Sequence, residues 1–284
     1  MATISENLIE LQTTKANIKA AIESKGQDLT DVPFTQYADK INEISVGGGE
    51  EDTLYAILTD TLTSCSVPSG VTEIKQYLFA DLTNLVSINL PNTVTKIGSY
   101  AFSKCKGLQN FDFPSSLTTI MGYAFEYCSS LTHVIIPKNV TNISQNVFAY
   151  CSNLESVVFE DYSVLTTLSS NMLRECTKLK DFVIPYNVTT IPNSMFNNCK
   201  GLTNLKIPKG VTKIDTYAFY YCSNILKYDF TECTQVPTLS NKNAFQLINA
   251  NCKIYVPDAL YDEWVAATNW ATYASYIAKA SEMV

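Results

Sequence analysis

The sequence contains few of the groups on which catalysis and nucleic-acid binding depend. Histidine occurs once in 284 residues, at His133, and 27 Asp and Glu outnumber 20 Lys and Arg, for a formal net charge of −7. Neutralising nucleic-acid phosphates requires a surplus of basic side chains, so this balance argues against a nucleic-acid partner. The chain has no P-loop and no dinucleotide-binding glycine fingerprint, and we expect no cofactor.

Long apolar runs and targeting signals are missing as well. The chain contains no run of 18 apolar residues, which is the length needed to span a bilayer. It also has no cluster of basic residues that would bind a membrane surface. The N-terminus, MATISENLIE, has no basic region followed by an apolar one, so we expect no signal peptide and no membrane insertion. Apolar residues nevertheless make up 46% of the chain, enough for a substantial core.

The chain is rich instead in a repeated motif, which its cysteines reveal. Six of the nine cysteines recur at intervals of 23 or 25 residues: Cys105, Cys128, Cys151, Cys176, Cys199 and Cys222. Phe or Leu stands three residues before each of them, and Leu or Ile three residues after. The pattern continues into a segment of the form LxxLxLP, such as LTHVIIP, and then into a second of the form VTxI. Eight copies and a closing strand cover about three quarters of the chain.

Alternation along these segments predicts a β-solenoid. Successive side chains of a strand point to opposite faces, so the fourth and sixth positions of LxxLxLP face inward, and the third and fifth face outward. One turn is too small to bury its own apolar face, so adjacent turns must stack around a shared core. Proline at the seventh position ends the strand. We therefore expect a repeat solenoid, mostly β with short helical turns, over residues 53–257.

The motif resembles the BspA-type leucine-rich repeat, LxxLxLPxxVTxIGxxAFxxCxx. IGSYAFSKCKGL and AFEYCSSLTHVIIPKNVTNI match it closely, and the resemblance covers roughly residues 62–257. It implies the leucine-rich repeat form of the solenoid. The 25-residue turn that carries EDYSVLTTL lacks the proline, which indicates a local bulge.

The regular spacing gives the cysteines a structural interpretation. Equivalent positions in adjacent turns lie about 4.8 Å apart, so the six cysteines should form a buried column in which each thiol meets a loop carbonyl. The alternatives are a chain of disulfides or a metal site. Parallel Cβ vectors are poor disulfide geometry, and no CxxC pair is present for zinc, so we favour the column and expect no metal.

Residues 1–46 break the repeat and predict a helical segment. Ser5 can cap a helix, and six residues then follow heptad spacing, with one lysine among them: Ile4, Leu8, Leu11, Lys15, Ile18 and Ile22. Either a monomeric helical hairpin or a short oligomerising or docking coiled coil fits, and a Gly-rich acidic linker follows at 47–52. ANIKAAIESKGQDLTDVPFTQYADKINEI resembles N-terminal segments of bacteriophage tail and other virion-associated proteins. That resemblance implies attachment to a larger assembly.

Residues 258–284 should form a helical cap, because a solenoid exposes an apolar cross-section at its end. Asp258 can cap the first helix, with Leu260, Trp264 and Ala267 on one side. We interpret Trp264 and Trp270 as cap residues before ligand contacts.

The outward third positions form a row that includes His133, Ser156 and Asp181 on successive turns. These residue types make up a hydrolase triad. An open, solvated sheet offers no oxyanion pocket, and Asp181 lies beyond Ser156 rather than behind His133. No pair of carboxylates suggests glycosidase chemistry, so we expect no catalytic residue and no enzyme.

The fifth-position row supplies the main candidate binding surface. Ile135, Val158 and Val183 follow one another, with Asp112 before them and Lys206 after. An exposed apolar stripe rimmed by charge is typical of a contact surface, although β-branched residues also simply suit a strand. His133 and Asp181 of the neighbouring row complete this candidate surface.

Tyrosines form a second candidate surface. Tyr77, Tyr100, Tyr123 and Tyr217 stand two residues before the aromatic position of the motif. Another three stand two residues after it: Tyr127, Tyr150 and Tyr221. Tyrosine binds sugars and proteins well, and we interpret the first set as half-buried packing and the second as more exposed ligand contacts.

The sequence thus predicts a non-enzymatic binding module. The phage-like segment and the lack of a signal peptide favour a phage tail or virion protein that contacts a protein or glycan on a host cell. Residues 1–46 would join it to a larger assembly, with a homo-oligomer as one form. The alternative is a bacterial cell-surface or secreted BspA-like adhesin.

Overall fold

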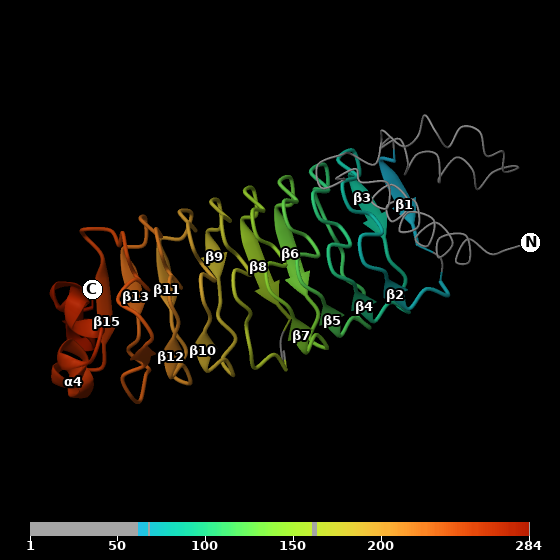
Figure 1. The fold of residues 1–284 in the computed structure, drawn as a ribbon. Coiled ribbons are helices and arrows are strands. Elements are labelled where there is room, and N and C mark those ends of the chain that lie inside the picture. Colours follow the sequence, from blue (N-terminus) through green and yellow to red (C-terminus); the bar gives the residue numbers. More distant parts are fainter. Residues whose placement is uncertain (1–61, 68, 161–163, 284) are drawn as a thin grey trace, which may run out of the picture.

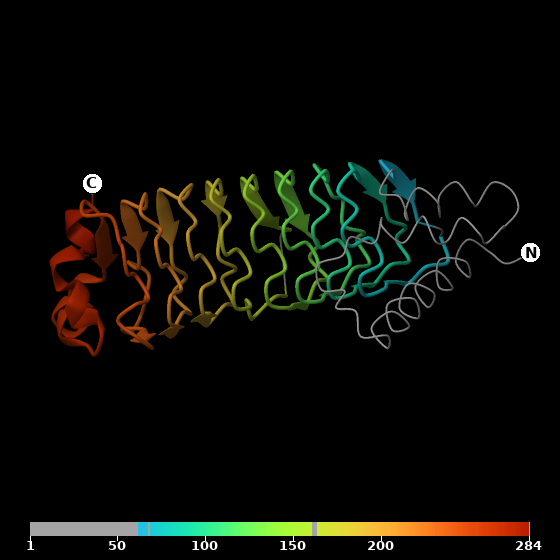
Figure 2. The same cartoon turned by 45° about the horizontal axis from the view of Figure 1, so that its top comes forward.

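A computed structural model gives the fold, and it describes residues 62–67, 69–160 and 164–283. These residues coil into an elongated solenoid whose turns stack side by side from β1 to β15, with short helices at the C-terminal end (Figure 1). The view turned by 45° shows the same continuous stack (Figure 2). The helices and coiled coil predicted for residues 1–46, and the linker at 47–52, lie outside the described residues.

The LxxLxLP segments form one row of strands, which we call the leucine face. Its strands are β1 (Ser64–Ser66), β3 (Ser87–Asn89), β6 (His133–Ile136), β8 (Ser156–Phe159), β9 (Asp181–Phe182), β11 (Asn204–Lys206), β13 (Lys227–Asp229) and β15 (Lys253–Val256). The row divides into three sheets, which begin at β1, β6 and β11. Within each sheet the strands pair in parallel with equivalent repeat positions opposite each other, as at Val134 and Val157. The strand β6 alternates between exposed His133 and Ile135 and buried Val134 and Ile136, so the predicted inward and outward positions are confirmed here.

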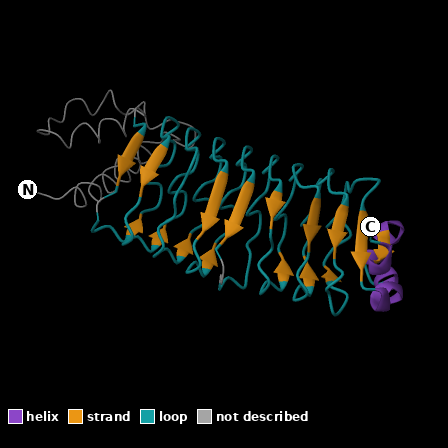
Figure 3. Cartoon of the chain, turned by 180° about the vertical axis from the view of Figure 1, so that it is seen from behind, coloured by secondary structure: helices purple, strands orange, loops and turns teal. Residues whose placement is uncertain are grey.

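The VTxI segments form a second row, which we call the threonine face. Its strands are β2 (Glu73–Ile74), β4 (Lys96–Ile97), β5 (Thr119–Ile120), β7 (Asn142–Ile143), β10 (Thr190–Ile191), β12 (Lys213–Ile214) and β14 (Thr238–Leu239). The two rows lie on opposite flanks of the coil (Figure 3). Exposed threonines tie successive turns together, because Thr118 Oγ1 donates to the Thr95 carbonyl at 3.0 Å and Thr141 Oγ1 to the Thr118 carbonyl at 3.4 Å.

The turns that lead from the threonine face to the next leucine strand contain the AFxxC motif, and we call them the turn edge. Two residues in most of these turns adopt φ near +60°, one lying two positions before the buried Phe or Leu and one two positions after. At the second turn, for example, Tyr100 has φ 57° and Lys104 has φ 63°. The amides of Tyr100, Phe102 and Lys104 donate to carbonyls of the following turn, at 2.7–3.1 Å. The left-handed residues thus permit alternate amides to point along the solenoid axis.

The core contains a column of phenylalanines beside the column of cysteines. Phe79, Phe102, Phe125 and Phe148 stack with centroid separations of 5.1–5.6 Å. The six repeat cysteines are all buried, and no disulfide joins them. Each thiol donates to the carbonyl of the Phe or Leu one turn earlier, at 2.9–3.2 Å between sulfur and oxygen.

The repeat LQNFDFP departs from the expected pattern, because it forms no strand. It keeps only a parallel bridge between Asn110 and His133. Phe111 packs edge-on against Phe102 and Phe125, with centroids 5.0 and 4.6 Å apart, and Phe113 lies 4.8 Å from Phe111. The bulge expected in the 25-residue turn falls on residues 161–163, which are outside the described residues.

The C-terminal segment is less helical than the sequence indicates. It comprises η2 (Asp258–Leu260), α4 (Tyr261–Ala266), η3 (Trp270–Tyr276), β16 (Ile277–Lys279) and η4 (Ala280–Glu282). The strand β16 pairs in parallel with β15, which otherwise would leave its backbone groups unpaired at the edge of the sheet. The prediction that Asp258 caps a helix is wrong, since its carboxylate instead accepts a hydrogen bond from the Ser281 amide at 3.0 Å.

Candidate binding surface

The leucine face carries an exposed apolar stripe. Ile135 lies directly opposite Val158 in the β6–β8 pair, and Val183 follows one turn later, just beyond β9. Their side chains are 57%, 51% and 80% exposed. The neighbouring positions Val134, Val157 and Phe182 point into the core, so strand alternation forces the stripe outward. We refer to Ile135, Val158 and Val183 as the apolar stripe.

Charged residues flank the apolar stripe along the solenoid axis. Asp112 is exposed in the preceding turn, and Lys206 is exposed in the following one, where its ammonium group pairs with Glu232. The hydrogen bond that Lys206 donates to the Glu232 carboxylate raises the pKa of Lys206. Three residues before Val158 and Val183, Lys180 donates to Glu155 at 2.8 Å, and this hydrogen bond lowers the pKa of the Glu155 carboxyl. Charge therefore borders the stripe while the stripe itself presents only hydrocarbon.

The third-position row has the order predicted from the repeat. His133 lies opposite Ser156, and Ser156 lies opposite Asp181, all on the outward side of the sheet. Ser156 therefore stands between the histidine and the aspartate. A hydrolase needs the histidine in the middle, where it can accept the serine proton and be oriented by the carboxylate. Asp181 and His133 accordingly belong to the candidate surface as polar neighbours of the stripe.

The three tyrosines of the second predicted set lie on the turn edge, apart from the stripe residues. Tyr127 and Tyr150 stack at 4.5 Å between centroids and 10° between planes, and the Arg174 guanidinium lies 5.5 Å from the Tyr150 centroid. Tyr221 is separate and has the Lys200 ammonium 3.9 Å from its ring centroid. Each of these rings already contacts an aromatic or cationic side chain, and the sequence does not reveal these contacts.

The two tyrosine sets overlap in exposure: Tyr100 and Tyr123 are half-buried, as expected for the first set, but Tyr77 is not. Tyr77, from the set interpreted as half-buried packing, is 43% exposed, against 39% for Tyr127 and for Tyr221. Both sets occupy left-handed positions on the turn edge, which hold the ring at the surface. Tyr77, Tyr100 and Tyr123 form a stack with centroid separations of 4.8 and 4.6 Å.

Two surface features were missed in the sequence. Tyr186 is 72% exposed just beyond Val183 and Pro185, where other copies have Asn92, Ser115 or Lys138 after the proline. The sequence could have revealed Tyr186, because it is an aromatic residue at a position where the other copies have polar ones. The second feature is a shallow hollow of about 640 Å³ between the threonine face and the turn edge.

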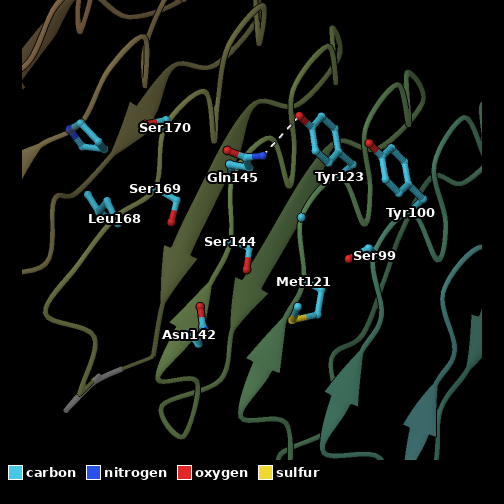
Figure 4. A pocket seen from close by; sticks show the side chains of 12 residues that line it. Ser99, Tyr100, Met121, Tyr123, Asn142, Ser144, Gln145, Leu168, Ser169 and Ser170 are labelled. Carbon is cyan, nitrogen blue, oxygen red and sulfur yellow. Dashed lines mark hydrogen bonds between the residues drawn. The ribbon is translucent and has the colours of Figure 1, made fainter.

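The hollow is uncharged, and polar side chains share its lining with the apolar Met121, Leu168 and Pro192. Four serines, Asn142 and Gln145 line it together with Tyr100 and Tyr123, and no charged residue of the described chain contributes to it. The Gln145 amide donates to the Tyr123 hydroxyl at 3.4 Å, and Gln145 and Ser169 lie on the side of Tyr123 away from Tyr100 (Figure 4). We call this feature the Tyr123 hollow.

The described residues were searched for metal-ligand clusters and for membrane-spanning helices. Within residues 62–67, 69–160 and 164–283, no three His, Cys, Asp or Glu side chains come together as metal ligands. The same ranges contain no helix with the length and apolarity required to cross a bilayer.

Parallel strands in two rows, turns tied by carbonyl–amide ladders and an outward-facing leucine strand define a leucine-rich repeat solenoid. The chain belongs to the BspA type leucine rich repeat region family, whose model matches residues 54–164, 108–226 and 163–261 in six copies. A search of curated proteins gives no match.

A search of solved structures finds similar chains. A leucine rich repeat protein of T. pallidum is 24% identical, over 59% of this chain and 79% of that one, with a TM-score of 0.53. A leucine rich cell surface protein from Faecalibacterium prausnitzii A2-165 is 21% identical over 69% and 78%, with a TM-score of 0.37. The pneumococcal vaccine antigen PcpA is 16% identical over 76% and 77%, with a TM-score of 0.35. At 24% identity, the T. pallidum structure shows only that the two proteins share a fold.

Proposed function

We propose that this chain is a non-enzymatic adhesion module of a bacterial cell-surface or secreted protein. Its leucine face would recognise a protein or glycan on another cell, with the apolar stripe at the centre of the contact. The observation that carries the proposal is the exposure of Ile135, Val158 and Val183, at 57%, 51% and 80%, on an otherwise polar row.

The energetics of burial support this use of the stripe. A contiguous apolar patch with a charged rim is the usual composition of a protein contact, because burying hydrocarbon contributes about 25 cal/mol per Å². Tyr186 adds an exposed aromatic beside Val183, and aromatic anchors dominate binding energies. We also propose that residues 258–283 close the end of the solenoid, since Trp264 and Trp270 are buried there against Phe230.

Membership in the BspA type family favours this proposal over the phage tail protein that the N-terminal segment suggested. The comparisons give the phage assignment no support, and residues 1–46, which carried it, lie outside the described residues. Tail and baseplate genes beside the coding sequence would favour the phage assignment, whereas export or sortase genes would favour the adhesin.

A substitution in the stripe tests the proposal. Val158→Asp places a charge at the centre of the stripe, and an apolar contact would have to remove water from that charge. Attachment of the fluorescently labelled chain to cultured epithelial cells should therefore fall at least about tenfold. Val86→Asp is the matched control, because Val86 is a 40% exposed valine two turns before β6.

Both variants should melt within about 2 °C of the wild type, since surface substitutions rarely change stability by more than about 0.5 kcal/mol. Pretreating the cells with trypsin or with periodate separates a protein ligand from a glycan. Equal attachment of the two variants, or no attachment by the wild type, would count against an adhesive role for the stripe.

A further inference from the structure

The tyrosine stack on the turn edge stops at the Tyr123 hollow. Tyr77, Tyr100 and Tyr123 occupy one left-handed position in three successive turns, and their rings are parallel within 15°. The next turns have Asn146, Asn171 and Ser194 at this position, with φ of 60°, 57° and 53°, before Tyr217 restores the tyrosine. The backbone is therefore the same throughout, and only the rings are missing from three turns.

The missing rings leave space beside Tyr123. Asn146 is buried and its short side chain does not extend the stack to the surface. Gly122, Ser144 and Ser169 line the Tyr123 hollow, and their small size leaves its space unfilled. An approaching flat ring could thus continue the stack on Tyr123, with the Gln145 amide at its edge (Figure 4).

The chemistry of the lining restricts what such a ring can be. The hydroxyls and amides of the hollow offer donors and acceptors in quantity but no counter-charge. Binding an anion or a cation there would desolvate the charge without compensation, and an apolar ring would leave these polar groups unpaired. A sugar ring avoids both costs, because its C–H face packs on tyrosine while its hydroxyls reach the serines and amides.

The shape of the hollow favours a chain of sugars over a single one. Five successive turns line it, from Ser99 and Tyr100 to Pro192. Four strand spacings of about 4.8 Å make it roughly 19 Å long. Polar side chains follow one another along this length, from Ser99 to Gln145 and Ser170, which suits a linear polymer lying parallel to the solenoid axis.

We propose that the Tyr123 hollow binds a neutral linear oligosaccharide, with one sugar ring stacked on Tyr123 and its neighbours hydrogen-bonded to Gln145, Ser144 and Ser169. This proposal rests on the proposed function, since it names a ligand class for a surface-recognition protein. It uses residues separate from the apolar stripe, so the two can be tested apart.

Calorimetric titration of the full chain with cellopentaose, maltopentaose and chitopentaose tests this site, with pentagalacturonate as the charged comparison. We expect at least one neutral oligosaccharide to bind with Kd below about 1 mM, and the charged one to bind at least about tenfold more weakly. Tyr123→Ala should weaken binding at least about tenfold, and Gln145→Ala, at an exposed position, should weaken it without affecting folding.

Asn146→Tyr is the sharpest variant. It should continue the stack and occupy the site, because tyrosine already adopts this φ at Tyr100 and Tyr123. Binding should be lost at an unchanged melting temperature. Tyr77→Ala, at the far end of the same stack, is the matched control and should bind as the wild type does.

The proposal is overturned if no neutral oligosaccharide binds with a Kd below about 1 mM, if only pentagalacturonate binds, or if Asn146→Tyr and Gln145→Ala bind normally. Failure here with intact, Val158-dependent cell attachment would remove the sugar site and leave the adhesion proposal standing. Sugar binding through Tyr123 without any cell attachment would remove the adhesion proposal alone.

Discussion

At the residue scale, each cysteine of the column fills a small buried space and donates to a carbonyl that also accepts a backbone amide, as the Phe102 carbonyl accepts the Cys105 amide at 3.1 Å. Cys128, for example, is fully buried and donates to the Phe102 carbonyl at 3.1 Å. Burial raises the pKa of this thiol well above its usual value of 9.0. The same cause raises the pKa of Cys176 and Cys199, and raises that of Cys222 to about 12.

These shifts predict a loss of stability in alkali. A thiol whose pKa is higher in the folded state keeps its proton there, while the unfolded chain ionises above pH 9. The contribution is therefore complete below pH 9 and disappears as pH rises toward the folded pKa. We expect each fully buried thiol to remove up to about 1.4 kcal/mol from the free energy of unfolding per pH unit above 9.

Urea unfolding of the wild type and Cys199→Ala between pH 8 and 10.5 isolates one such thiol. The difference in unfolding free energy should be constant up to pH 8.5 and then shrink, because the variant has one fewer group to ionise in its unfolded state. A difference that stays constant to pH 10.5 would mean that the Cys199 thiol is not held neutral by burial.

At the scale of elements, the phenylalanine column shows that a turn keeps its backbone conformation when the buried residue of the motif changes. Leu173 replaces phenylalanine between Phe148 and Phe196 and is itself fully buried. The turn around it keeps the same left-handed residues, Asn171 and Glu175, and the same thiol–carbonyl bond from Cys199. The backbone of a turn thus depends on an apolar side chain at this position rather than on a particular ring.

This observation predicts unequal effects of two substitutions at Phe148. Phe148→Leu should cost about 1.5 kcal/mol or less, because leucine fills this position one turn later, whereas Phe148→Ala should cost about 3–5 kcal/mol through the cavity that it leaves. Urea unfolding measures both. Similar losses for Leu and Ala would show that the stacked ring, and not the filled volume, stabilises the column.

The strands of the leucine face were predictable because alternation and spacing are local in sequence. His133, Val134, Ile135 and Ile136 take the faces that their positions in the motif predict. The missing strand at Asn110 and the added strand β16 were not predictable, since LQNFDFP has the same alternation as the copies that form strands, and β16 forms by pairing with the distant β15. The Tyr123 hollow exists because three turns lack tyrosine at a position where other turns have it. A search for repeated residues finds those that recur and overlooks those that are missing.

At the scale of the whole molecule, stacking converts a short motif into two long, differently composed surfaces. Polar third positions and the apolar stripe share the leucine face, whereas the turn edge presents tyrosines and, beside them, an uncharged hollow. Both surfaces keep a fixed period along the solenoid axis, which favours extended partners. A rigid solenoid changes little on binding, so a ligand meets a surface that is already formed.

Carbene footprinting of the chain, free and bound to epithelial cells, tests most directly whether the leucine face is the recognition surface. The label modifies exposed side chains, and mass spectrometry locates it. We predict that labelling of Ile135, Val158, Val183 and Tyr186 falls on binding, while labelling of Val86 is unchanged. Protection confined to the threonine face, or equal labelling of the stripe in both states, would contradict a binding role for the leucine face.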